Sequence, residues 1–543
     1  MSLFEKVLVK NPKRARFDFS HGNSLGMRFG MLTPSEVRFI VPGDEVAVSM
    51  EQIVRLAPMP VPTFVNMKVR HDWFFVPLSM MYTKRAMDLL LGVGASNTRN
   101  RARVANWRSY IANFCGLDSP LLPGSIHDYL GYPCPSDLNA GATAGTDIHA
   151  FLLNPDQTHY DAIFDYSNGS LGGATKQGEA FPFTIEPLLA YHYIWRDYYR
   201  FTGVQVDTVP GTESWLDNHV FAENFINLAI THSDTITFSS LSSIGIPSNL
   251  HHAGSGDSPI TFHRFLGRPY YAHYKKDMYT SIRYGSKPTV LIPTGTSGTI
   301  PNLREASAVQ KFVDIISVAG SRYWDKVKAV WGVTPEGMKD ERVKFLARYM
   351  SFIKVGEVIT TATTEDAQTG DYAGRGLLID GKYIFRRRFS EHGWLMCISS
   401  IVPDLHYYGF NRQFWDVNML DTPIPQFAQV GDQSVQQREL WYDWQGLNNT
   451  PVLGDQFRYY AYKSAPNEVH GDFLMKSFEA WTALGKFSYG NNIIDMTKVL
   501  PQDWNQVFGF VGNPHIYGNK FFLDLTFHEY ITRSLPKYIS YSL

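Results

Sequence analysis

The stretch from Pro42 to Pro77 restricts the fold most, because two strand-like runs flank a proline-rich corner. From Val65 to Phe75, apolar side chains and His71 occupy the odd positions, and the polar residues between them are Asn66, Lys68, Arg70 and Asp72. Alternate side chains of a strand point to opposite faces. The pattern therefore predicts a strand with one buried face and one polar face.

The earlier run, Glu45 to Leu56, is rich in Val and Ile and predicts a second strand. Between the two runs, Pro58, Pro60 and Pro62 have no backbone N–H, so they cannot lie in a central strand. Pro42-Gly43-Asp44 predicts a turn before the first strand. Two strands joined by such a corner are typical of an antiparallel β-sandwich, a fold that does not by itself define a function.

Composition excludes some classes of protein. The chain has 543 residues with 50 Lys and Arg against 51 Asp and Glu, a net charge of -1, so neither a strongly basic nucleic-acid binder nor an acidic disordered chain is indicated. Aromatic residues make up 14% and charged residues only 19%. This bias is typical of protein interfaces, but large β-sandwich cores and glycan-binding clefts share it.

Cysteine content and hydropathy indicate where the chain folds. Cys115, Cys134 and Cys397 form an odd set without metal-ligand spacing, which predicts reduced thiols. No apolar run reaches the roughly 20 residues that span a bilayer, and the first residues lack the apolar segment of a secretory signal. We therefore expect no membrane span, and we expect synthesis in a cytoplasm.

The chain order predicts one interrupted domain. Residues 1–44 are expected to form an N-terminal arm, and 45–543 a single sandwich. The Gly-, Asn- and Ser-rich stretches at about 92–184 and 202–260 are expected to be insertions, and 302–355 a helical segment. Helices are predicted over Ser79–Leu91, Glu186–Phe201, from Asn302 to Gly320 and over Arg322–Trp331. The aromatic density of Glu186–Phe201 suggests burial against a partner.

Further strands are expected near the C-terminus, after a polar, Gly-rich loop over Gly356–Gly381. They are predicted at Tyr383–Phe389, Trp394–Val402, Phe457–Tyr462 and Phe521–Ile531. Strands that begin near residue 45 and close near residue 530 favour one sandwich with large insertions over a series of domains.

Motifs of common enzymes are absent from the sequence. It contains no Gly-rich phosphate loop, no G-x-S-x-G elbow and no H-E-x-x-H helix. The sequence leaves open the alternative of a carboxylate pair for glycoside hydrolysis, but no particular pair of Asp or Glu residues stands out. His251, His252 and His263 are close together without accompanying ligands at metal spacing, so loop histidines explain them better than a metal site. We predict no catalytic, cofactor or metal residues.

A basic cluster near the N-terminus is the one candidate binding element. It comprises Lys10, Lys13, Arg14 and Arg16, followed by Phe17 and Phe19 in alternation. A solvated arm along the domain edge accounts for this cluster, and so does an arm that contacts nucleic acid or a partner.

Several segments, in this order, resemble the major capsid proteins of microviruses, in particular the gokushovirus-like branch. They are Asn11–Asp18, Pro42–Asp44 with Arg55–Met59, Asp72–Pro77, Ala190–Tyr199, Lys276–Ser281, Asn302–Ala306, Gly332–Pro335, Glu391–Gly393, Asp404–Tyr407, Tyr462–Asp472 and Arg533–Tyr538. The chain departs from the family pattern at Ala347–Met350. The resemblance is interrupted between about 120 and 185 and between 202 and 260.

The resemblance implies a mainly β fold, an eight-stranded antiparallel jelly-roll β-sandwich with large loop and helical insertions. It implies a structural protein, not an enzyme, that forms a T=1-type icosahedral shell around circular single-stranded DNA. The implied partners are other copies of the chain, the DNA genome, a small basic packaging protein, pilot and scaffolding proteins and a host receptor. The expected location is the virion, after assembly in the bacterial cytoplasm.

In that context Lys10, Lys13, Arg14 and Arg16 are expected to face the DNA. Gly131–Gly173 and Thr202–Asp257 are expected on the outer surface near a symmetry axis, where they would serve host attachment, although one of them could instead clamp a neighbouring subunit. The alternative from another class is a carbohydrate-binding or glycan-hydrolysing β-sandwich.

Overall fold

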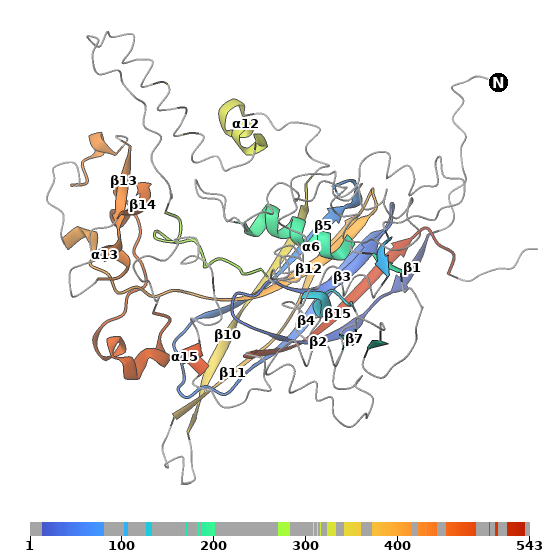
Figure 1. Cartoon of the computed structure of the whole chain (residues 1–543), viewed down its shortest axis with the longest axis horizontal. Helices are drawn as coiled ribbons and strands as arrows, with labels where there is room; N and C mark the ends of the chain where they lie inside the picture. Colours follow the sequence, from blue (N-terminus) through green and yellow to red (C-terminus); the bar gives the residue numbers. More distant parts are fainter. Residues whose placement is uncertain are drawn as a thin grey trace, which may run out of the picture.

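The computed structural model describes the sandwich and the segments that pack on it (Figure 1). The described residues are 14–80, 103–106, 126–132, 164–165, 170–171, 182–184, 186–200, 270–282, 308, 312, 315, 323–332, 342–359, 372–414, 422–428, 431–442, 452–484, 499, 505–508 and 519–537.

Nine strands form the main sheet. They are β1 (Ala15–Asp18), β2 (His21–Met27), β3 (Thr33–Ile40), β4 (Glu45–Leu56), β5 (Met67–Pro77), β10 (Lys344–Ile359), β11 (Tyr372–Arg388), β12 (Gly393–Pro403) and β15 (Phe521–Arg533). All pairings between them are antiparallel.

The strands pair in a nested order along the sequence, the earliest strand of the eight with the latest and so on inwards. β2 pairs with β15, β3 with β12, β4 with β11 and β5 with β10. The nested pairs then join side by side, because β15 also pairs with β4 and β12 with β5. This is the topology of a long antiparallel ribbon rolled into two layers, which confirms the eight-stranded jelly roll; β1 adds a short strand beside β15.

The two layers meet along β10. Residues 344–353 of β10 pair with β5, whereas Lys354–Ile359 pair with β11 in the other layer. One layer, which we call the β15 layer, contains β2, β15, β4 and β11, and the β12 layer contains β3, β12, β5 and the first part of β10. In Figure 1 these strands lie close together in one curled sheet.

The core between the layers centres on Trp73 of β5. Its side chain is fully buried and contacts Phe385 of β11 and Phe527 of β15 edge-on, at 5.6 and 5.8 Å between ring centroids. Phe75 packs against Phe389 in a tilted arrangement with the ring centroids 4.6 Å apart. These contacts cross from one layer to the other, so the aromatic residues predicted on the buried face of β5 hold the sandwich together.

A polar chain also crosses the core. The imidazole of His71 on β5 contacts Gln52 Oε1 of β4 at 2.9 Å through Nε2 and Ser399 Oγ of β12 at 2.7 Å through Nδ1. The Ser399 and Ser35 hydroxyl oxygens lie 2.7 Å apart, which extends these contacts to β3. Burial lowers the pKa of His71 to about 3, so the ring is neutral in the folded protein.

The predicted turn before β4 is confirmed and has a specific anchor. Gly43 adopts φ +89°, a left-handed conformation that favours glycine. The fully buried Asp44 carboxylate accepts from the Val41 amide at 3.1 Å and ion-pairs with Arg533 of β15 at 2.6 Å. The turn that begins β4 is thereby fixed to the end of the last strand.

The helix predicted over Glu186–Phe201 is present as α6 (Glu186–Ile194) followed by a π-helical turn, η3 (Trp195–Tyr199). Every residue of α6 is buried. Trp195 stacks on Tyr270 at 4.0 Å, Tyr191 donates to the Leu32 carbonyl at 2.8 Å, and Trp394 of β12 donates to Glu186 at 2.9 Å. The aromatic density of this helix thus serves contacts within the chain.

Two expectations near the N-terminus were wrong. Most of the arm expected over residues 1–44 belongs to the sheet, because β1, β2 and β3 occupy 15–40 and pair with β15 and β12. The polar face expected for β5 is also buried, since this strand is central and α6 with η3 cover its outer side. Asp72 there ion-pairs with Arg348 at 2.5 Å and accepts from Tyr199 at 2.8 Å, and Lys68 pairs with Asp404.

Three expectations in the second half were also wrong. β10 and β11 occupy both ends of the loop expected over Gly356–Gly381, and β10 occupies the end of the helical segment expected over 302–355. Glycine was misleading here: Gly376 lies in the sheet, where a Cβ would come within 2.7 Å of the Leu56 side chain, so the glycine leaves room for that side chain. The strand expected over Phe457–Tyr462 ends at Phe457, because Tyr459 turns the chain at φ 63°.

The remaining elements are shorter. They are η1 (Leu78–Met80), β6 (Arg103–Asn106), α3 (Ile126–Tyr129), β7 (Phe164–Asp165), β8 (Ser170–Leu171), β9 (Pro182–Thr184), α12 (Tyr323–Trp331), η6 (Arg412–Phe414), η7 (Pro425–Phe427), β13 (Asp432–Gln436), α13 (Gln437–Leu440), β14 (Val452–Phe457), η8 (Tyr460–Tyr462), η9 (Gly471–Leu474), η10 (Lys476–Trp481) and α15 (Asn505–Phe508). α12 confirms the helix predicted over Arg322–Trp331. The helix predicted over Ser79–Leu91 lies mostly outside the described residues, as do both large insertions.

We expect Trp73→Ala to lower the free energy of unfolding by about 3–5 kcal/mol, because it opens a large cavity between the layers. The matched control is Trp331→Ala on α12, where the indole is 67% exposed and the loss should stay within about 0.5 kcal/mol. Urea unfolding of the unassembled chain measures both. Equal losses for the two variants would contradict the role assigned to Trp73.

We also expect stability to fall as the pH decreases from about 6.5 towards 3, because below pH 6.5 the unfolded chain protonates His71 while the folded chain does not. His71→Gln should reduce this slope by up to about 1.4 kcal/mol per pH unit. Denaturant unfolding between pH 4 and 7 measures the slope, with His470→Gln, an exposed histidine, as control. An unchanged slope in His71→Gln would refute the assignment.

Candidate interaction surfaces

The outer face of the β15 layer carries exposed apolar side chains, which we call the apolar patch. Its members are Ile53 (37% exposed), Leu377 (38%), Ile379 (69%), Tyr383 (57%) and Phe522 (42%). Scattered single apolar residues are normal on a surface, but a contiguous group marks an interaction site.

The strand register shows which members of the apolar patch are neighbours. Ile379 of β11 lies directly opposite Ile53 of β4. Two residues along, Arg55 of β4 lies between Leu377 of β11 and Phe522 of β15. Directly paired residues on one face of a sheet have Cβ atoms about 5 Å apart. Ile53, Leu377 and Ile379 therefore form one apolar surface across β4 and β11, and Phe522 of β15 lies beyond Arg55 on the same face.

The far end of the same face is basic, and we call it the basic end. It contains four exposed arginines: Arg14 and Arg16 at the N-terminus, and Arg386 and Arg388 at the end of β11. Arg387 between them is also exposed, but it lies opposite the buried Val46 and points to the other face of the strand. In register, Arg388 lies opposite Glu45, Glu45 opposite Thr532, and Thr532 opposite Arg16. Strands are about 4.8 Å apart, so the Arg16 and Arg388 backbones lie roughly 14 Å apart on one face.

Contacts within the basic end leave most of its charge facing solvent. The Arg16 guanidinium lies over the Tyr530 ring at 3.9 Å from its centroid, and Arg386 ion-pairs with Glu45 at 2.5 Å while 66% exposed. Arg14 donates to the carbonyls of Gly43 and Thr532, the latter at 3.2 Å. Exposed guanidinium groups beside an aromatic ring match the groups that bind phosphates and stack on bases in single strands.

The predicted DNA-facing residues are therefore only partly placed. Lys10 and Lys13 lie outside the described residues, whereas Arg14 and Arg16 lie at the basic end. The structure adds Arg386 and Arg388, which the sequence analysis did not assign to this surface. Three consecutive arginines were a visible signal, but only the pairing of β11, β4, β15 and β1 brings them towards Arg16.

The outer face of the β12 layer is mostly covered by the chain itself. The η3 segment contacts it through Tyr199, and burial and the nearby Asp72 carboxylate raise the pKa of this phenol well above its ordinary value. Beyond the covered part, Phe345, Met350 and Phe352 of β10 are 40%, 44% and 47% exposed. A strip of β10 therefore stays open beside the apolar patch.

Other candidate residues give no site. Cys397 is a buried free thiol whose pKa is raised by burial, so it is not a reactive surface cysteine. Cys115, Cys134, His251, His252 and His263 lie outside the described residues. Among the helices that the structure describes, none is long and apolar enough to cross a membrane.

Comparison with known protein families identifies the family to which this chain belongs. The model of the capsid protein (F protein) family of phages matches residues 6–134 and 180–539. The chain belongs to this family. The unmatched residues, 135–179, lie within the insertion predicted from the sequence at about 92–184.

Similar proteins support the same conclusion. The chain is 23% identical to capsid protein VP1 of Chlamydia phage 1 over 94% of this chain and 95% of that protein. It is 20% identical to capsid protein VP1 of Bdellovibrio phage phiMH2K, over 88% and 86% of the two chains. A shorter match, 24% identical over 39% of this chain and 38% of its relative, links it to capsid protein VP1 of Spiroplasma virus 4.

The predicted resemblance to microvirus major capsid proteins is thus confirmed. The chain is a structural component of a virion, and its function is to build a capsid with other copies of itself. A carbohydrate-binding or glycan-hydrolysing sandwich is not favoured.

We expect Ile379→Asp to raise the protein concentration needed for assembly by at least about tenfold, because it places a charge in the apolar patch at a cost of about 1.4 kcal/mol or more per contact. Both this residue and Phe414, which is 76% exposed outside the patch, can change without disturbing the core. Phe414→Asp is therefore the matched control. Light scattering against concentration measures assembly, and identical curves for wild type and Ile379→Asp would contradict a role for the patch.

Proposed function

We propose that this capsid protein forms a T=1-type icosahedral shell around a circular single-stranded DNA genome. The observation that carries the proposal is that one open face of the jelly roll combines the apolar patch with the basic end. An apolar surface is stabilised by burial against a neighbouring subunit. A basic surface is stabilised by a polyanion. A shell around DNA supplies both the neighbouring subunit and the polyanion.

The genome contact extends from the N-terminus to β11 in this proposal. Lys10, Lys13, Arg14 and Arg16 face the particle interior, and Arg386 and Arg388 extend the same surface. Contacts of this kind neutralise phosphates and release counterions, so they depend on salt and little on sequence. A small basic packaging protein, the other partner that the family resemblance implies, would share the same polyanion and reduce the number of contacts each subunit makes.

The insertions form the outer surface in this proposal. Gly131–Gly173 and Thr202–Asp257 are rich in Gly, Ser, Asn and Thr. Most of the first stretch falls in residues 135–179, which the family model leaves unmatched, whereas the second lies within the matched residues 180–539. Loops on a rigid scaffold commonly carry recognition, and copies gathered at a symmetry axis gain avidity for a host receptor. Protease treatment of intact particles tests this: cleavage in both stretches with loss of attachment supports it, whereas full protection of both opposes it.

The remaining partners follow from the same proposal. Assembly takes place in the host bacterial cytoplasm, where pilot and scaffolding proteins act on the shell. The domain division belongs to this proposal too: the chain is a single jelly-roll domain that carries all insertions, so that removal of an insertion leaves the strands paired.

Negative-stain electron microscopy of the purified chain tests the central claim that the chain forms closed shells. Closed shells of one size support it, and soluble monomers whose unfolding temperature rises with added sugars would favour the rival glycan-binding function.

We expect Arg386→Ala combined with Arg388→Ala to weaken binding of single-stranded DNA and to reduce the slope of log affinity against log salt by about 1.4, since each lost phosphate contact contributes roughly 0.7. The matched control combines Lys354→Ala with Lys382→Ala, two exposed cations on β10 and β11 away from the basic end. Fluorescence anisotropy with a labelled oligonucleotide at several salt concentrations gives the slopes. If both double variants lose the same amount, the basic end has no special role.

A further inference from the structure

Three ionisable side chains converge where β2 of the β15 layer approaches β3 of the β12 layer. His21 of β2, Glu36 of β3 and Glu529 of β15 each offer one ligand atom, and these atoms all lie within 4.8 Å of one another. The His21 Nε2 atom is 2.6 Å from Glu36 Oε2. The side chains of Glu36 and Glu529 are only 4% and 1% exposed, whereas that of His21 is 33% exposed. The cluster is therefore deep but reachable from solvent along His21.

Neighbouring groups orient two of the three side chains. His21 contacts the Phe19 carbonyl through Nδ1 at 2.9 Å, so Nδ1 carries a proton and Nε2 points into the cluster. Arg38 Nη2 lies 2.8 Å from Glu36 Oε1, which leaves Oε2 directed towards His21. A histidine fixed by a backbone carbonyl and a carboxylate held by a second charged group are the usual supports of metal ligands.

The third side chain is the strongest indication of a missing ligand. Neither carboxylate oxygen of Glu529 accepts a hydrogen bond from any group that the structure describes. Arg38 Nε is 3.4 Å from Glu529 Oε2, an ion-pair contact without hydrogen-bond geometry. A buried carboxylate in this state is costly unless something else neutralises it.

We propose that His21, Glu36 and Glu529 bind a divalent transition-metal ion, with Zn²⁺ as the best match. One imidazole nitrogen and two carboxylate oxygens are donors that zinc accepts, and a water molecule can complete a tetrahedral site. The surroundings are otherwise apolar and aromatic, because the Phe527 ring stacks on His21 at 5.2 Å and Phe19 lies beneath the Arg38 guanidinium at 5.2 Å.

The position of the site indicates what the ion does. β2 and β15 belong to one layer and β3 to the other, so a bound ion links both layers where the N-terminal strands join the sheet. Binding to the folded but not the unfolded chain stabilises the fold by mass action. The ion would thus fasten the first strands of the jelly roll. This inference is independent of the proposed DNA contact.

The test uses the full-length, untagged, unassembled chain after treatment with a chelator. Isothermal titration with Zn²⁺ should show saturable binding of about one ion per chain and a higher unfolding temperature. Co²⁺, used as a spectroscopic substitute, should give the visible absorption bands of a tetrahedral site. Glu529→Gln, which keeps the shape of the side chain and removes a buried charge, should weaken Zn²⁺ binding by at least about tenfold while the protein stays folded.

A second variant and a control complete the test. His21→Gln should weaken binding similarly. His528→Gln is the matched control, because His528 also lies on β15 and pairs with a carboxylate, Glu51, at 3.3 Å on the exposed face. It should retain full binding. Absence of saturable binding, or equal binding by wild type and Glu529→Gln, overturns the proposal. A stability that responds to pH but not to Zn²⁺ overturns it too, and assigns the cluster to proton uptake.

Discussion

The position of β15 between β2 and β4 in the sheet is the constraint on which the rest of the fold depends. Phe521–Arg533 pairs with β4 along almost its whole length and with β1 and β2 on the other side. Its inward side chains fill the core, and Phe527 contacts Trp73 of the opposite layer. The last strand thus lies in the interior of a layer whose other members come from the first and middle parts of the chain, so the sandwich closes only when the C-terminus has arrived.

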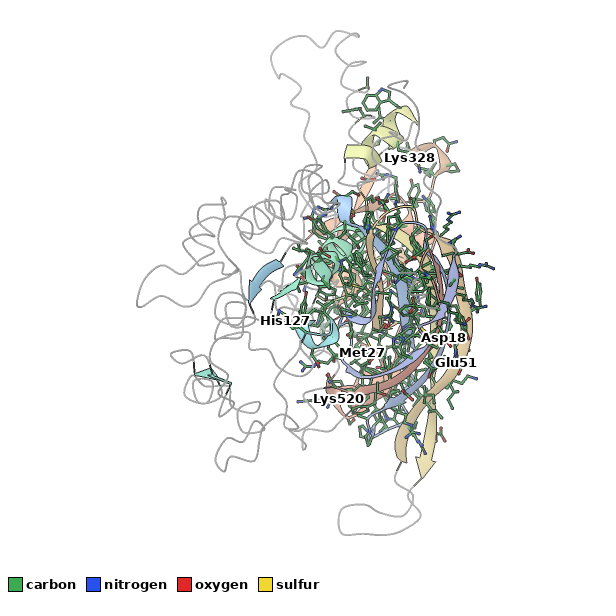
Figure 2. All side chains as sticks on the ribbon, turned by 90° about the vertical axis from the view of Figure 1, so that its right-hand side faces the viewer. Asp18, Met27, Glu51, His127, Lys328 and Lys520 are labelled. Atoms are coloured by element: carbon green, nitrogen blue, oxygen red, sulfur yellow. The ribbon has the colours of Figure 1, made fainter. Side chains whose placement is uncertain are left out.

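This closure explains why the fold tolerates large insertions. The nested pairs are held by cross-strand contacts and by anchors such as Asp44 with Arg533, and none of these depends on the length of the chain between β5 and β10. The entropic cost of a longer loop grows only slowly with its length. Figure 2 shows side chains filling the space between the strands of the sandwich. The insertions can therefore differ among capsid proteins while the strand register stays fixed.

The sequence predicted the parts of the fold in which local pattern and tertiary surroundings agree. Alternation along Phe521–Ile531 gave β15, because one face of this strand is buried and the other is exposed. The same rule failed for the even positions of β5, where Asp72 and Lys68 are buried with charged partners under covering segments. Periodicity cannot reveal a covering layer. The glycine-rich composition was misleading at Gly376, where glycine makes room for Leu56 and does not mark a loop.

The candidate surfaces were harder to predict than the strands. The apolar patch consists of residues from β4, β11 and β15 that are hundreds of positions apart in the chain, and only the register places Ile53 beside Ile379. The basic cluster was visible in the sequence, but its continuation to Arg388 was not. The metal-binding cluster gave no sequence signal, because His21, Glu36 and Glu529 follow no ligand spacing.

The open face of the β15 layer places two opposing requirements on the free subunit. Apolar side chains such as Ile379 favour association, whereas the arginines at the basic end repel the same arginines of any copy that approaches face to face. A polyanion removes that repulsion, since phosphates neutralise the arginines and release counterions. Burial of the apolar patch and neutralisation of the basic end are then coupled, because each makes the other less costly. A subunit built in this way would assemble poorly alone and readily around nucleic acid, so shell formation would be linked to the presence of its cargo.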